Sequence, residues 1–83
     1  MTFEERNNMV LNMIAEFKVV HDRYTSSTKI LTDDEWETYI HSMDENLDKY
    51  KGTNLAEFAG RLWMVFLDDT EYMQKRLKSY AKT

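Results

Sequence analysis

The sequence predicts an all-α fold: a compact antiparallel bundle of four helices, or of three helices if residues 55–82 form one continuous helix. The 83 residues contain no Pro and only two Gly. This composition favours long helices with short connections, because Pro interrupts helices and marks loops. The apolar fraction of 42% is sufficient for a hydrophobic core. A single helical domain over residues 1–83 is therefore expected, near the lower size limit for a domain that folds without disulfides or metals.

A repeated local pattern predicts where the helices begin. In this pattern, a residue that can cap a helix N-terminus is followed three positions later by Glu, whose side chain can bond back to the cap. The pattern occurs at Thr2 and Glu5, Thr32 and Glu35, Asn54 and Glu57, and Asp68 and Glu71. Each occurrence precedes a run of regularly spaced apolar residues, so the pattern predicts four helix starts.

The first helix is predicted from Phe3 to Tyr24, followed by a polar loop at residues 25–29. Its apolar face has helical spacing and comprises Phe3, Val10, Ile14, Phe17, His21 and Tyr24. The breadth of this face predicts contact with two other helices. His21 is expected at the edge of the core, with one ring nitrogen hydrogen-bonded to a carbonyl or hydroxyl group.

The second helix is predicted from Asp33 to Tyr50. A narrow apolar stripe with alternating spacings of four and three residues defines its buried face: Trp36, Ile40, Met43, Leu47 and Tyr50. Gly52 follows this helix and is expected in the left-handed conformation that glycine adopts beyond a helix C-terminus.

The third helix is predicted to begin near Leu55 and is apolar over more than half of its circumference. Such a helix is typically central or half covered by a partner. Met73, Leu77 and Tyr80 continue its apolar phase, which favours one long helix. However, residues 68–70 (Asp-Asp-Thr) have low helix propensity and contain a helix-start pattern. We therefore predict a break at residue 68 and a fourth helix after it.

Negative charge is concentrated in one segment. The net charge of the chain is −4 at pH 7, and residues 33–51 alone contribute −5, from seven carboxylates and two lysines. This acidity disfavours direct binding to nucleic acid or to an anionic membrane. The chain has no Cys, which excludes disulfide and thiolate–zinc scaffolds and favours a cytoplasmic location. No secretory signal pattern or membrane-spanning apolar run is found.

One face of the second predicted helix carries most of this charge. At about 100° per residue, six side chains fall in the sector opposite the apolar stripe. This acidic face comprises Asp34, Glu37, His41, Asp44, Glu45 and Asp48. It is open to three interpretations: a solvated surface, which is the commonest role of such a stripe; a docking surface for a basic partner; or a metal site at Glu37, His41 and Glu45. A single helix supplies too few convergent ligands for a metal site, so neither a metal nor a cofactor is predicted.

The leading functional hypothesis is a small acidic protein–protein interaction module. It would act as a regulator or inhibitor by occupying a basic surface of a partner protein, through the acidic face with Trp36 and Tyr39 at its margin as anchors. Mimicry of nucleic acid is the sharpest form of this hypothesis, and a phage or another mobile element is a fitting source for such an inhibitor. No enzyme is predicted, because no nucleophile occurs beside a base in a recognisable context.

Two alternative functions use other parts of the chain. The apolar third helix could form the interface of a homodimer or a larger assembly. The C-terminal basic cluster could contact phosphates in a nucleic-acid accessory protein, although cations at a helix C-terminus are also expected from the helix dipole alone. This basic cluster comprises Lys75, Arg76, Lys78 and Lys82.

Overall fold

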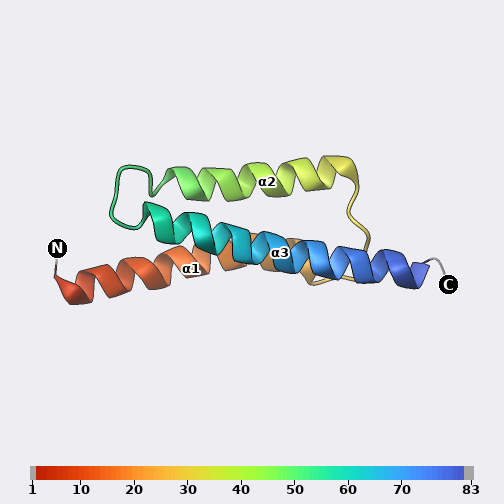
Figure 1. Ribbon diagram of the computed structural model, residues 1–83, viewed down its shortest axis with the longest axis horizontal. Coiled ribbons are helices and arrows are strands. Elements are labelled where there is room, and N and C mark those ends of the chain that lie inside the picture. The colour runs from red at the N-terminus through yellow and green to blue at the C-terminus, as the bar shows by residue number, and fades with distance from the viewer. Residues whose placement is uncertain (1, 82–83) are drawn as a thin grey trace.

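The computed structural model describes residues 2–81, which form three helices and no strand. Helix α1 spans Phe3–Thr25, α2 spans Asp33–Asp48 and α3 spans Ala56–Ala81. Helices α1 and α3 run side by side in the same direction, and α2 runs antiparallel to both (Figure 1). The all-α prediction is confirmed. The four-helix prediction is wrong, because the predicted third and fourth helices are one helix.

The bundle is elongated rather than compact, which corrects a second part of the fold prediction. Its principal extents are 54 × 20 × 17 Å and its Cα radius of gyration is 14.7 Å, against about 12 Å for a compact domain of this length. The 26 residues of α3 make a rod of about 39 Å at 1.5 Å per residue. The first turns of α1 and the last turns of α3 project at opposite ends of the molecule (Figure 1).

Local capping establishes the first two helix starts, as predicted. The Oγ1 atom of Thr2 accepts a hydrogen bond from the Glu5 amide at 3.1 Å. Thr32 and Glu35 form a complete capping box, in which each side chain accepts from the backbone amide of the other at 3.2 and 3.1 Å.

The connection between α2 and α3 is a tight turn around Gly52. Gly52 has a φ of 76°, the left-handed conformation that the sequence predicted for it. In this turn, Thr53 Oγ1 accepts from the Leu55 amide at 3.2 Å. Helix α3 begins at Ala56, one residue after the predicted start near Leu55.

Helix α3 continues through residues 68–70 because tertiary contacts hold side chains that favour a helix poorly. Thr70 is fully buried. Its hydroxyl donates to the Phe66 carbonyl at 2.9 Å and lies 2.8 Å from the Tyr39 hydroxyl. The neighbouring Asp69 lies 2.7 Å from the His21 ring. These contacts to α1 and α2 offset the low local propensity, so the predicted helix start at Asp68 is wrong.

All three helices contribute to one hydrophobic core. Its buried members are Met13, Phe17, Val20, Tyr39, Met43, Tyr50, Leu55, Ala59 and Trp63. Tyr39 is central, with edge-to-face ring contacts to Tyr24 at 5.1 Å and to Trp63 at 5.8 Å. Phe3 and Ile40, both predicted in apolar faces, lie outside it: Phe3 is 81% exposed and Ile40 is 40% exposed.

The loop between α1 and α2 is fixed to α3 by one buried side chain. The Gln74 side-chain carbonyl accepts from the Leu31 amide at 2.9 Å, and its amide group donates to the Lys29 carbonyl at 3.1 Å. A single glutamine thus satisfies two backbone groups of a segment that has no secondary structure of its own.

Candidate functional site

The acidic face lies on the side of α2 that is turned away from α1 and α3, except at its edge, where Asp44 contacts α3. The buried side chains of this helix are Tyr39, Met43 and Asn46, and all six residues of the acidic face are exposed. The face is therefore available to a partner along the whole helix. Its exposure is compatible both with a solvated surface and with a docking surface.

Few cations neutralise the acidic face. Asp48 pairs with Lys51 at 2.7 Å, which raises the pKa of that lysine, and His41 pairs with Glu45 at 2.8 Å. Both pairs are largely solvent-exposed, so they contribute little to stability. Among residues 2–81, no cation forms an ion pair with Glu37 or Asp34. The face therefore keeps most of its negative charge.

Asp44 differs from its neighbours because it also has a structural contact. The indole N–H of the buried Trp63 donates to Asp44 Oδ1 at 3.0 Å. This bond joins α2 to α3 and satisfies the only polar atom of the tryptophan side chain. Replacing Asp44 would therefore disturb the fold as well as the surface charge.

The two aromatic anchors predicted at the margin of the acidic face both pack in or against the core. Tyr39 is 0% exposed, so its assignment to a partner surface is corrected. Trp36 is partly buried against the core, with its ring edge-on to Tyr39 at 5.8 Å. Tyr39 is buried because the buried face of α2 is rotated by about 40° relative to the predicted apolar stripe, at about 100° per residue. Asn46 takes a buried position in consequence, where its amide donates to the Glu16 carbonyl at 3.2 Å.

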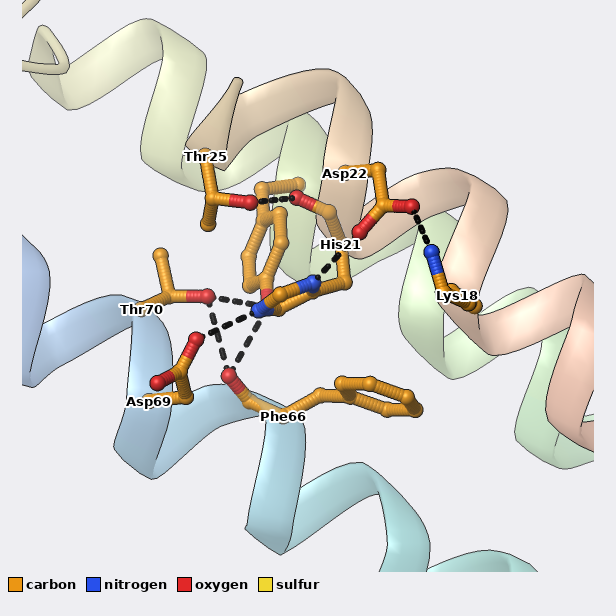
Figure 2. A network of polar contacts seen from close by, with 8 residues as sticks. Lys18, His21, Asp22, Thr25, Phe66, Asp69 and Thr70 are labelled. Carbon is orange, nitrogen blue, oxygen red and sulfur yellow. Dashed lines mark hydrogen bonds and ion pairs between the residues drawn. The ribbon is translucent and has the colours of Figure 1, made fainter. Parts of the chain in front are cut away.

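A second polar cluster joins α1 to α3 around His21, as Figure 2 shows. The ring lies at the edge of the core, 4.8 Å from the Phe66 ring. Its Nδ1 lies 3.0 Å from Asp22 and its Nε2 lies 2.7 Å from Asp69. Lys18 and the His21 contact hold the pKa of the Asp22 carboxyl below its usual value. The core-edge prediction for His21 is confirmed, but its partners are carboxylates rather than a carbonyl or hydroxyl.

This histidine cluster lacks the arrangement of an acid–base catalyst. In a catalytic triad, a carboxylate binds one ring nitrogen of the histidine and orients the ring. The other ring nitrogen accepts the proton of the nucleophile. Both nitrogens of His21 face carboxylates. The nearby Thr70 hydroxyl donates to a backbone carbonyl. The geometry therefore supports a structural tie between α1 and α3.

A hollow lies between the start of α1 and the first half of α3. It has a volume of about 640 Å³ and is lined by Arg6, Asn54, Glu57, Phe58, Arg61, Leu62 and Val65. Arg61 and Glu57 pair with each other at 2.5 Å. The sequence indicated an unusually apolar third helix, but the hollow itself depends on the packing of α1 against α3 and was not predicted.

The basic cluster at the end of α3 is partly engaged within the chain. Arg76 donates to the hydroxyls of Tyr72 and Tyr80 at 3.1 and 3.0 Å, which raises the pKa of the guanidinium. Lys82 lies outside the described residues. The cluster therefore gives no defined phosphate-binding geometry, and the nucleic-acid alternative gains no support from it.

Comparison with known proteins adds no relative: no protein-family model, curated protein or solved structure matches the chain. Within residues 2–81, no three His, Asp or Glu side chains converge as metal ligands. None of the described helices has an apolar stretch long enough to cross a bilayer.

Proposed function

We propose that the protein is a small protein-binding module that occupies a basic surface of a partner protein through the acidic face of α2. The observation that carries this proposal is the exposed row of carboxylates on the side opposite the core, most of which have no cation beside them. Such a row favours a positively charged partner by steering and by charge complementarity. The module acts by occupancy rather than by turnover, as a regulator or an inhibitor does.

The spacing of the carboxylates supports a narrower form of the proposal. Five carboxylates of the acidic face are distributed from Asp34 to Asp48, a length of about 21 Å at 1.5 Å per residue. This is about one negative charge per 4 Å, close to the one phosphate per about 3.4 Å along a single strand of B-DNA. A basic groove that normally binds nucleic acid is therefore a fitting target.

A matched pair of charge reversals tests the proposal. Glu37 and Glu71 are both exposed glutamates in helix interiors, and only Glu37 belongs to the acidic face. The experiment compares wild type, Glu37→Lys and Glu71→Lys as baits in affinity purification from the native host, followed by quantitative mass spectrometry. We expect a basic partner that wild type and Glu71→Lys retain, and that Glu37→Lys loses at least about tenfold, because like-charge contacts strongly disfavour binding.

Two results would contradict the proposal. One is equal retention of the partner on all three baits, which would place the contact elsewhere. The other is retention that does not weaken between about 0.1 and 1 M salt, since contacts between exposed charges are screened over that range. Circular dichroism of the three proteins controls for loss of helicity.

A further inference from the structure

The outward face of α3 carries an exposed apolar stripe, in which the Tyr72 ring is contacted by Arg76 of the same helix, whose guanidinium lies 5.7 Å from the ring centroid. Phe58, Val65 and Tyr72 are seven residues apart, and their side chains are 40%, 62% and 58% exposed. At about 100° per residue, all three lie within about 20° of the Val65 direction. A repeat of seven is the spacing of a coiled-coil seam, in which one helix packs along another.

Charges flank one side of this stripe in an alternating order. Glu57, Arg61, Asp68 and Lys75 are all exposed. At about 100° per residue they lie on the same flank, about 40–80° from Val65. Their signs along the helix are negative, positive, negative and positive. Residues at similar distances before and after Val65 therefore carry opposite charges. Only a helix that runs unbroken through Asp68 brings these four residues to one side.

We propose that this face of α3 is the contact between two copies of the chain, packed antiparallel about a two-fold axis near Val65. Arg61 lies about 6 Å before Val65 along the helix and Asp68 lies about 4.5 Å after it. The two-fold axis places each Arg61 beside Asp68 of the second copy, on the same flank. Glu57 and Lys75, about 12 Å before and 15 Å after Val65, meet in the same way.

The hollow between α1 and α3 fits the same arrangement. Tyr72 lies seven residues after Val65, so antiparallel packing brings it opposite Phe58 of the second copy. Phe58, Leu62 and Val65 line the hollow, which receives the tyrosine ring. Arg6 lines the hollow on the α1 side.

A second copy matches this surface because the pattern is complementary to itself. In a two-fold contact the same patch occurs on both sides, so every favourable pair is formed twice. In a parallel two-fold pair this flank of one copy would instead face the opposite flank of the other copy, so these four charges would not meet one another. Within residues 2–81 of the monomer, Arg61 pairs with Glu57, and both side chains are nearly four-fifths exposed, so exchanging this pair for intermolecular contacts costs little.

A charge exchange between two variants tests the dimer. The proteins are wild type, Arg61→Glu, Asp68→Arg and Glu71→Lys, studied by sedimentation equilibrium at tens of micromolar, about the range that separates a weak dimer from a monomer. We expect wild type and the Glu71→Lys control to form dimers. Each of the other two variants places like charges together twice, and we expect its dimer dissociation constant to rise at least about tenfold.

Mixing the two weakened variants is the decisive step. In a mixed pair, Glu at position 61 faces Arg at position 68, and the native Arg61 faces the native Asp68. We expect an equimolar mixture to regain the dimer, which a general loss of folding could not produce. A monomeric wild type at these concentrations would overturn the proposal, as would a mixture that stays monomeric. A Val65→Glu variant that still forms a dimer would place the contact on another face.

Discussion

The buried contact between Tyr39 and Thr70 gives the sharpest test of the fold. Both residues are fully buried, and burial raises the pKa of the Tyr39 phenol. The Thr70 hydroxyl donates to the Phe66 carbonyl at 2.9 Å, so the Tyr39 hydroxyl is the donor in the 2.8 Å contact between them. Tyr39→Phe removes this hydrogen bond but leaves Thr70 with its acceptor. We expect the free energy of unfolding to fall by about 1 kcal/mol.

The reverse change leaves a buried donor without a good acceptor. After Thr70→Val, the Tyr39 hydroxyl has only the Phe66 carbonyl, at 3.4 Å, so we expect a loss of about 1–3 kcal/mol. The double variant retains no unpaired polar group from this contact. Its loss should fall short of the sum of the single losses by about 1 kcal/mol, because the two positions share one interaction.

Urea unfolding followed by far-ultraviolet circular dichroism measures all three variants at one fixed protein concentration, since dimer formation would add stability. In thermal unfolding, each kcal/mol corresponds to about 4–8 °C in Tm for a domain of this size. Strictly additive losses would refute the assignment of a shared hydrogen bond. An unchanged stability of Tyr39→Phe would show that this hydroxyl does not hold α2 to α3.

Two further outcomes follow from contacts outside the core. Gln74→Leu should lower the free energy of unfolding by about 1–3 kcal/mol, because the Leu31 amide and the Lys29 carbonyl lose their partner; unchanged hydrogen exchange at the Leu31 amide would contradict this. The pKa of Glu35 is lowered by its bond from the Thr32 amide and by Lys29, so its contribution to stability is present above the ordinary glutamate value and is lost as the pH falls through the lower, folded value. Glu35→Gln keeps the capping box but removes this acid-sensitive part, and urea titrations between about pH 7 and pH 3 should show a shallower loss than in wild type; identical acid profiles would contradict it.

Local sequence patterns predicted the features whose causes are local. Thr2 and Thr32 cap helices because their bonding partners lie three residues away, and Gly52 adopts a positive φ within one turn. Asp68 showed the same local pattern, yet no helix begins there. The difference lies in contacts from residues distant in the chain: Tyr39 bonds to Thr70 across 31 positions, and no periodicity within one helix encodes such a pair.

The same limit explains the outcome for the candidate site. Helical periodicity placed the carboxylates of α2 on one exposed face, because a charged stripe is evident within a single helix. It misplaced Tyr39, whose hydroxyl suggested the margin of the acidic face but is buried where Thr70 offers it a partner. Asn46 is buried in the same way, with the Glu16 carbonyl as its acceptor. The predicted break at residue 68 also concealed the proposed contact surface on α3, because the charges that flank Val65 share one side only in a continuous helix.

The two proposed surfaces lie on opposite sides of the molecule, and this placement constrains the partner. Helix α2 packs on the side of α3 that carries Trp63 and Thr70, which lies about 140–160° around the helix from Val65. A dimer formed through α3 therefore leaves both acidic faces uncovered and points them away from each other. Two identical faces on one particle bind a two-fold symmetric or repetitive basic partner far more strongly than one face does, by about 10²–10⁴ when the geometry allows both to engage. A small exposed charged surface supplies only modest affinity. With two faces engaged at once, that affinity is sufficient for stable occupancy of the partner.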